Sequence, residues 1–321
     1  MRSSTIHAMK KGEAKNNRVL VIGRSCIDVI SVIERFPEED TKVPIYERTV
    51  EGGGQGATAA CCIARLGGEV AYWGKIGDDE AGNFCLKRLR DFGVDTRWIE
   101  VVAGGKTPAA YIFITQKTGA RTIFYEPSQL PPLDPHDLDP LFSPPPAVVL
   151  LDPETTYLIE EIRNKSGDKT KIVYDGERWS PSIAKAMALA DYFVPSCDFL
   201  SLPELAIRDL PFTEQIYTLA HRLAGQLVVT AGKRGAYYLE DGHLYHVLPP
   251  PVKVKDTTGA GDNFHAAFSF SISRGCSLSE AVKLAVSVAS LSCRALGGRR
   301  GLPSLTEARE VAQALAAKPY P

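Results

Sequence analysis

The sequence has no substantial excess of charge of either sign, because its 321 residues include 37 lysines and arginines against 38 aspartates and glutamates. Such a balance gives little attraction for the phosphate backbone of nucleic acid or for an anionic lipid surface. No stretch reaches the roughly 18 apolar residues that a membrane span requires. The polar and basic residues 1–17 lack the apolar segment of a signal peptide, and we predict a disordered tail there. We therefore expect a cytoplasmic protein without nucleic acid or membrane partners.

Motifs built on cysteine and histidine are also absent. The seven cysteines are scattered, odd in number and without a C-x-x-C pair, which predicts reduced thiols rather than disulfides. The six histidines form no H-E-x-x-H motif, and His243 and His246 lie in a turn-like segment that favours the edge of a hairpin. Because a zinc site needs several convergent ligands, we predict no structural metal.

Short apolar runs recur along the chain with room for helices between them. The first run, residues 18–23, ends at a glycine, as a buried strand of a parallel sheet often does. Further strands are predicted at residues 70–73, 147–151, 171–174, 191–194 and 227–230, a hairpin at 235–248, and helices at 57–66, 78–93, 260–274 and 278–295. This alternation predicts one α/β domain over residues 18–321 with a mainly parallel sheet.

Another group of β-rich segments has a different composition. Residues 29–35, 43–50, 109–116 and 121–126 are rich in β-branched residues but partly polar, and residues 117–120 between the last two form a hairpin-type turn. Such segments suit a small, half-exposed sheet that is separate from the main core. We predict a β lid formed by about residues 29–50 and 105–126.

The segment of residues 255–268 contains the strongest chemical signal. Thr257 and Thr258 can cap a helix, and apolar residues then recur at helical spacing. The next three residues, Gly259, Ala260 and Gly261, have no bulky side chains, so a phosphate can approach the backbone. Free amides of the first helical turn, together with the helix dipole, would form a site for the oxygens of a transferring phosphoryl group.

Asp262 lies in the same first turn and is the candidate base. There the helix dipole is expected to lower the pKa of its carboxyl group and keep it ionised at neutral pH. A weak base suffices for phosphoryl transfer, because positioning and charge neutralisation supply most of the catalysis. From the residues alone, a simple helix-start carboxylate is an equally good interpretation of Asp262.

Residues 256–264 closely resemble the C-terminal signature of the ribokinase-like (PfkB) carbohydrate kinases, D-T-x-G-A-G-D-x-F, in which the last aspartate is the catalytic base. The resemblance extends over about residues 18–305. It implies a three-layer α/β/α domain with a mainly parallel central sheet and a small β-sheet lid. It also implies ATP and Mg²⁺ as cofactors and, in several relatives, a monovalent cation such as K⁺ beside the loop of Asp256.

The glycine-rich run of residues 51–60 resembles the family's N-terminal signature, in which the backbone and an asparagine bind sugar hydroxyls. The resemblance makes Gly53, Gly54 and Thr58 candidate substrate residues. Thr58 stands where the family usually has asparagine, so a shorter hydroxyl replaces an amide there. Asp28 matches the family carboxylate that accepts hydrogen bonds from the sugar, and Arg121 resembles a lid arginine that faces substrate or phosphate. A turn aspartate and an exposed hairpin arginine are the alternatives.

Residues 229–236 resemble the nucleotide-binding turn of the family. By this resemblance Thr230, Gly232 and Gly235, together with Thr258, are candidate nucleotide-binding residues. The family's N-x-x-E motif, which is linked to magnesium and phosphate, should fall near residues 194–199 but is degenerate here. No metal ligand is therefore predicted by residue.

The resulting hypothesis is ATP-dependent phosphorylation of a hydroxyl, expected to be primary, on a sugar or sugar derivative that is ketohexose-like or sugar-acid-like. The glycine run and the tail of residues 297–303 favour the ketohexokinase and sulfofructose kinase branches. A nucleoside kinase of the adenosine type shares the same framework and stays open. The half-exposed lid could also join two chains in a homodimer.

Two functions of other classes remain as alternatives. Residues 54–59 spell G-x-G-x-x-A, as in dinucleotide-dependent oxidoreductases, but the segment before them is too polar for a buried strand. A Walker-type phosphate loop fails, because Glu100 stands where residues 104–107 would need an upstream glycine. A non-catalytic sugar-binding sensor is less favoured, since Asp262 is intact.

Overall fold

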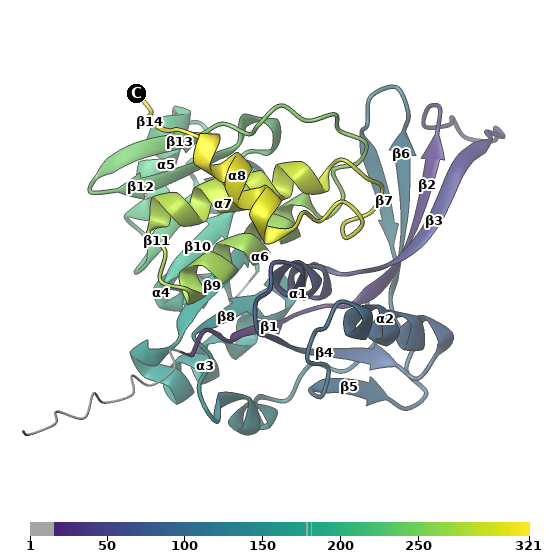
Figure 1. The fold of residues 1–321 in the computed structure, drawn as a ribbon, viewed down its shortest axis with the longest axis horizontal. Coiled ribbons are helices and arrows are strands. Elements are labelled where there is room, and N and C mark those ends of the chain that lie inside the picture. Colours follow the sequence, from purple (N-terminus) through teal and green to yellow (C-terminus); the bar gives the residue numbers. More distant parts are fainter. Residues whose placement is uncertain (1–15, 178, 181) are drawn as a thin grey trace, which may run out of the picture.

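The computed structural model describes residues 16–177, 179–180 and 182–321. Most of the predicted tail, residues 1–15, therefore lies outside the described residues. Within them the main feature is a ten-stranded sheet (Figure 1). Its strands in spatial order are β14 (Ala317–Pro319), β13 (His243–Val247), β12 (Ala236–Glu240), β11 (Gln226–Thr230), β10 (Tyr192–Pro195), β9 (Lys171–Gly176), β8 (Val148–Leu151), β1 (Val19–Ile22), β4 (Val70–Gly77) and β5 (Ile99–Val102).

The seven strands from β11 to β5 are parallel, whereas β12, β13 and β14 form an antiparallel end of the sheet. The central strand β1 is the apolar run Val-Leu-Val-Ile, and all four residues are buried. Such a continuous apolar run is typical of a parallel strand that helices cover on both faces. The hairpin predicted near residues 235–248 is present as β12 and β13, with His243 and His246 in its second strand.

Helices cover both faces of this sheet. Within the described residues the α-helices are α1 (Gln55–Arg65), α2 (Glu80–Asp91), α3 (Ile159–Ser166), α4 (Ile183–Leu189), α5 (Phe212–Ala220), α6 (Ala260–Ser273), α7 (Leu278–Ser292) and α8 (Leu305–Ala314). Short 3₁₀ helices are η1 (Pro135–Phe142), η2 (Pro153–Leu158), η3 (Gly167–Lys169), η4 (Cys197–Ser201), η5 (Pro203–Leu205) and η6 (Gly232–Arg234).

Two separate apolar cores show which helices share a face. Val19 and Val21 pack in one core with α1, α6, α7 and α8. Leu20 and Ile22 pack in the other core with α3, α4 and α5. Because successive side chains of a strand point to opposite faces, one apolar strand supplies both cores. The result is a three-layer α/β/α arrangement. None of the described helices combines the length and the apolar character needed to cross a membrane.

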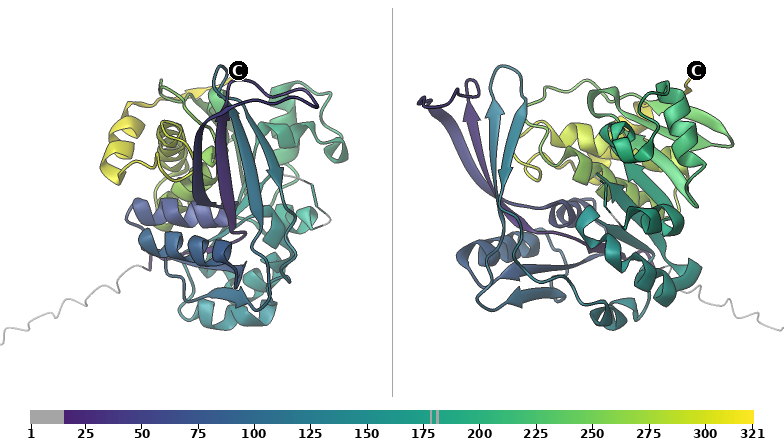
Figure 2. Two further views of the ribbon diagram at one scale, coloured as in Figure 1. Left: turned by 90° about the vertical axis from the view of Figure 1, so that its right-hand side faces the viewer. Right: turned by 180° about the vertical axis from the view of Figure 1, so that it is seen from behind.

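A second, four-stranded sheet stands apart from the main body (Figures 1 and 2). Its order is β3 (Ile45–Gly53), β2 (Cys26–Ile33), β6 (Ala109–Thr115) and β7 (Arg121–Tyr125). Ile30 and Ile112 belong to a small core on one face, and Leu296 of the main domain packs against it. Other large apolar side chains of this sheet are exposed, including Tyr46, Phe124 and Tyr125. The sheet thus has the separate, half-exposed character that its sequence predicts.

Candidate active site

Helix α6 begins next to the base of the small sheet, and its first turn holds the predicted phosphoryl-binding residues. Its N-cap is Gly259, with φ of 73°, a left-handed conformation that favours glycine. The predicted capping by Thr257 and Thr258 is wrong. The reason is that the Asp256 carboxylate forms the turn instead, accepting the backbone N–H of Thr258 at 2.8 Å. The Thr257 hydroxyl accepts a hydrogen bond from Arg121.

The turn before α6 is tied to the loop that follows α7. The second carboxylate oxygen of Asp256 accepts the N–H of Gly297 at 2.8 Å, and the Asn263 side chain donates to the Gly298 carbonyl at 2.8 Å. The two backbones approach so closely that a Cβ on Gly259 would lie 2.7 Å from the Cα of Gly298. Two distant segments therefore hold the turn in one conformation. A monovalent cation beside Asp256 stays a prediction.

Asp262 lies in the first turn of α6, as its sequence position predicts. Burial raises the pKa of its carboxyl group above the ordinary value, and the nearby His265 acts in the opposite direction. The expectation that the helix dipole sets a lowered pKa is therefore wrong, because loss of solvation outweighs the favourable charges around the group. With a raised pKa, the Asp262 carboxylate binds a proton more readily than its sequence position suggests.

The backbone amide of Ala260, one of the predicted anion-binding residues, already makes a long hydrogen bond within the protein. Its N–H donates to the Thr257 carbonyl at 3.2 Å. The amides of Gly261 and Asp262 follow in the same turn, where an α-helix supplies no acceptor of its own. A Cβ on Gly261 would meet nothing within 4 Å, so the space beside this residue is open. The turn thus offers its amides of residues 261 and 262 to a ligand.

Three further buried carboxyl groups belong to this region: Asp152 and Asp175 line a small cavity together with Asp262, and Asp28 lies near the start of β2. Burial raises the pKa of Asp28 to about 6, that of Asp152 to about 6 and that of Asp175 to about 7. The charge of Asp262 contributes to the raised pKa of both Asp28 and Asp175. Sequence reasoning found Asp28 but missed the other two. Each of them ends or directly follows a buried parallel strand, β8 or β9, which was the available signal.

Asp28 lies on β2 against the start of the glycine run. Its Oδ1 accepts a hydrogen bond from the Cys26 thiol at 3.3 Å. Any Cβ on Gly53 would collide with the Asp28 carboxylate, so only glycine permits this approach. Gly54 has φ of 87°, and a Cβ there would meet the Arg24 carbonyl. The two predicted glycines therefore bring the backbone close to Asp28.

Thr58 is buried, and the structure gives its hydroxyl a partner within the protein. The hydroxyl accepts a hydrogen bond from Arg299 Nε at 3.3 Å, and Arg299 Nη2 donates to the Gly53 carbonyl at 2.9 Å. Arg299 itself is 2% exposed. Sequence reasoning did not assign this arginine a role, although its Gly-Gly-Arg-Arg segment was noted. The side chain spans the gap between β3 and α1 beside the position where the family usually has asparagine.

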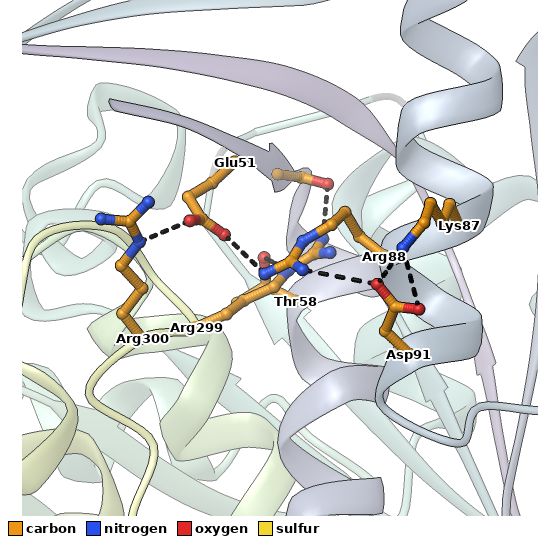
Figure 3. A network of polar contacts seen from close by, with 8 residues as sticks. Glu51, Thr58, Lys87, Arg88, Asp91, Arg299 and Arg300 are labelled. Carbon is orange, nitrogen blue, oxygen red and sulfur yellow. Dashed lines mark hydrogen bonds and ion pairs between the residues drawn. The ribbon is translucent and has the colours of Figure 1, made fainter. Parts of the chain in front are cut away.

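Buried Glu51 connects the small sheet to the main domain (Figure 3). Its carboxylate, 3% exposed, pairs with Arg300 on one side and with Arg88 of α2 at 3.4 Å on the other. Arg88 in turn contacts Asp91 at 3.4 Å. Because β3 carries both Glu51 and Gly53, these ion pairs fix the strand that presents the glycine run.

A cavity of about 780 Å³ opens beside the first turn of α6 and is lined by Ala260, Gly261 and Phe264 of this helix. It is lined by three of the predicted nucleotide residues, Thr230, Gly232 and Gly235, and by Gly261 of the turn. Thr258 is not among the lining residues. The volume of the cavity suits a nucleotide. Apolar residues line much of the cavity: Val252, Val254, Phe264, Val286 and Ala289. An apolar wall beside a helix N-terminus fits a base at one end and phosphates at the other.

Arg121 links the small sheet to this cavity. It lies at the start of β7, lines the cavity, and donates to the Thr257 carbonyl at 2.9 Å and hydroxyl at 2.7 Å. The guanidinium therefore lies beside the helix turn where a phosphoryl group would bind. Arg121 is at the same time an exposed residue of the β6–β7 hairpin, so its role toward substrate or phosphate stays a prediction.

Metal-ligating side chains do not gather in the described residues, where no group of three or more histidines, cysteines or acidic residues could hold an ion. The segment that should carry N-x-x-E forms the end of β10 and η4, and Asp198 there lines the nucleotide cavity. Magnesium commonly binds to nucleotide phosphates and water with few protein ligands. Such a sparse site is compatible with Mg²⁺ that arrives with the nucleotide.

Comparisons with known proteins agree with this architecture. The profile of the pfkB family carbohydrate kinases matches residues 16–305. Mouse ketohexokinase is 25% identical over 293 residues, which cover 87% of this chain and 97% of the mouse protein. Ribokinase of Bacillus subtilis is 27% identical over 305 residues, covering 91% of this chain and 98% of that protein.

Solved structures show the same fold. Ribokinase from Thermotoga maritima superposes with a TM-score of 0.78 at 22% identity, covering 92% of this chain and 99% of the other. Arabidopsis thaliana ribokinase, whose structure contains ribose and ATP, has a TM-score of 0.78 at 22% identity and covers 94% of this chain and 99% of the other. The predicted fold class is confirmed.

The chain belongs to the pfkB family of carbohydrate kinases. It is an ATP-dependent phosphotransferase, a sugar or nucleoside kinase of the ribokinase type.

Proposed function

We propose that this kinase phosphorylates a primary hydroxyl of an uncharged, ketohexose-like sugar. The observation that carries this proposal is a set of four carboxyl groups, those of Asp28, Asp152, Asp175 and Asp262, whose charges act on one another. Carboxylates accept hydrogen bonds from sugar hydroxyls. They also repel a carboxylate, sulfonate or phosphate on the acceptor, which disfavours the sugar-acid alternative. The similarity to mouse ketohexokinase supports the ketohexose class.

In the proposed reaction Asp262 takes the proton of the acceptor hydroxyl, whose oxygen attacks the γ-phosphorus of ATP. The bond between the γ-phosphorus and the bridging oxygen breaks, and ADP leaves. The amides of Gly261 and Asp262 and the guanidinium of Arg121 would stabilise the charge on the transferring group. Mg²⁺ bound with ATP would neutralise phosphate charge. Asp28 would hold and orient the sugar.

The acceptor class is tested by measuring ADP release by the purified full chain with ATP and Mg²⁺. The panel contains fructose, ribose, adenosine and gluconate, each with Asp262→Asn as the background control. We expect the largest kcat/KM with fructose and the smallest with gluconate, and a larger value with ribose than with fructose would contradict the ketohexose class. A larger kcat/KM with gluconate would contradict the electrostatic argument. Turnover of adenosine alone would favour the nucleoside alternative, which the 28% identity to an aminoimidazole riboside kinase of Salmonella typhimurium keeps open.

Two accessory properties are proposed as well. Asp256 and the loop of Gly297 would bind a monovalent cation such as K⁺, and replacing K⁺ by tetramethylammonium should then lower kcat. The exposed apolar face of the small sheet, with Tyr46 and Phe124, would pair two chains. Light scattering of the wild type and of Phe124→Asp tests the dimer, and a monomeric wild type would contradict it.

A further inference from the structure

His265 lies one helical turn after Asp262, on the buried side of α6. Its side chain is nearly buried, and the residue is 4% exposed. Nδ1 lies 2.7 Å from the Gly261 carbonyl oxygen, and Nε2 lies 2.9 Å from the Val194 carbonyl oxygen at the end of β10. Both ring nitrogens therefore face hydrogen-bond acceptors.

This geometry determines how many protons the ring carries. A neutral imidazole has one N–H and one lone pair, whereas an imidazolium has two N–H donors. A lone pair that faces a buried carbonyl oxygen leaves both groups without a hydrogen bond, which is costly. Only the doubly protonated ring satisfies both carbonyls at these distances.

The charges around the ring can balance an imidazolium. The nearest carboxylate is Asp175 on β9, whose Oδ1 lies 3.6 Å from Nε2. Asp262 on the same helix also interacts with the ring charge. A small cavity beside His265 is further lined by Asp152 from the end of β8 and by Gln55 of α1. Glu177, beyond β9, adds negative charge, and the more distant cations that act on Asp262 are Arg121 and Arg299.

We infer that His265 is a buried imidazolium that positions the catalytic turn and favours the ionised form of Asp262. The inference rests on the proposed role of Asp262 as the base. His265 acts through other groups and is a positioning residue. Its Nδ1–H holds the Gly261 carbonyl, so the peptide group that carries the Asp262 amide is fixed. Its Nε2–H ties the same helix to β10, which leads into the wall of the nucleotide cavity at Ser196 and Cys197.

The protonation state can be measured without any kinase assay. The full chain is labelled with ¹⁵N-histidine, and the ring signals are assigned with His265→Gln and His221→Gln. His221 is an internal control, because its Nδ1 bonds the Tyr217 carbonyl at 2.6 Å in the same helical geometry on an exposed surface. We expect both ring nitrogens of His265 to stay protonated at pH 8. One unprotonated nitrogen in His265 at pH 8 would overturn the inference.

The effect on Asp262 is tested with His265→Gln, which removes the charge and keeps one amide donor. Loss of the cation should move the acid limb of the kcat/KM profile upward by about one pH unit, because a nearby opposite charge shifts a carboxyl pKa by about 1 to 3 units. We expect kcat to fall about tenfold and KM for ATP to stay constant. His243→Gln on the exposed hairpin is the matched control. An unchanged pH profile would overturn the electrostatic role.

Failure of this inference and failure of the proposed function give different results. If the wild type shows no kinase activity with any acceptor, the ring protonation is still read by NMR, and the titration of Asp262 is followed with ¹³C-labelled aspartate. If His265→Gln does not fold, the NMR measurement on the wild type decides. Catalysis with a neutral His265 would leave the kinase assignment intact and remove only the imidazolium.

Discussion

The region of Asp28 and the region of the large cavity, which flank the first turn of α6, differ in their residue types. The proposed acceptor side contains buried charged groups, among them Asp28, Asp152, Glu51 and Arg299. The proposed nucleotide side consists largely of glycines, prolines and apolar residues around a cavity of about 780 Å³. Buried charges are costly unless they are paired or hydrogen-bonded, so their positions are sensitive to substitution. An apolar wall tolerates changes of similar volume far better. We therefore expect the acceptor side to be the more fragile one.

The largest effect is expected at the boundary between the two sides. Asp262→Asn removes the proposed base, so kcat should fall by about 10² to 10⁴-fold while ATP affinity changes little. Kinetics with the best acceptor and calorimetric titration of a non-hydrolysable ATP analogue measure the two quantities. Asp241→Asn, on the exposed β12–β13 turn, is the control. Near wild-type turnover by Asp262→Asn would remove its role as base.

The next effect concerns stability. Glu51→Gln leaves Arg88 and Arg300 without their shared buried carboxylate, and the free energy of unfolding should fall by about 2 kcal/mol. Arg97→Ala breaks an ion pair in which Arg97 is 78% exposed, and the loss should stay below about 1 kcal/mol. Urea unfolding of both variants measures the difference. Equal losses of unfolding free energy would show that the buried ion pairs of Glu51 stabilise the protein no more than an exposed pair does.

Two glycine substitutions compare the sides directly. Gly53→Ala forces a Cβ against the Asp28 carboxylate, so KM for the sugar should rise about tenfold or more, as one displaced hydrogen-bonding group costs about 1 to 3 kcal/mol. A Cβ on Gly232, on the nucleotide side, would meet nothing within 4 Å, although its φ of 53° strains any other residue. Gly232→Ala should lower stability by about 1 kcal/mol and leave KM for the sugar unchanged. A similar sugar KM in both variants would contradict the comparison.

The smallest effect is a dependence of stability on pH. Burial raises the pKa of Asp28 to about 6 from its usual value near 4, so the folded protein binds more protons than the unfolded chain in this range. This contribution to stability is present below about pH 4 and is lost as the pH rises to about 6. Asp28→Asn should therefore flatten the fall in melting temperature between pH 4 and 7. Scanning calorimetry across this range measures it. An unchanged slope would show that Asp28 is not the group responsible.

Local chemistry was enough to predict much of the fold. The apolar runs at β1, β8 and β11 predicted buried strands because they are continuously apolar, without polar alternation. The helix predicted over residues 78–93 is α2, and Asp79 caps it by accepting the Gly82 amide. Strands β5 and β14 were not predicted. Both are short and partly exposed, so neither carries a distinctive hydrophobic pattern.

The candidate site was only partly predictable. Asp262 and the glycines before it are one contiguous motif, and the small residues there have a direct chemical meaning. Asp152 and Asp175 are separated from them along the chain and meet Asp262 only because neighbouring parallel strands end at one edge. Arg299 reaches Thr58 across 241 positions of sequence, a contact that no local pattern records.

The sequence by itself determined the class of enzyme, the candidate phosphoryl-binding turn and the identity of the candidate base, because each depends on residue types within a short stretch. Only the tertiary structure decided the properties of that base. The helix dipole is a local effect and predicted a lowered pKa for Asp262. Burial beside other carboxyl groups is a property of the assembled sheets, and it raises the pKa of Asp262 instead. The reason is that the free energy lost when the carboxylate is removed from water exceeds its stabilisation by the helix dipole.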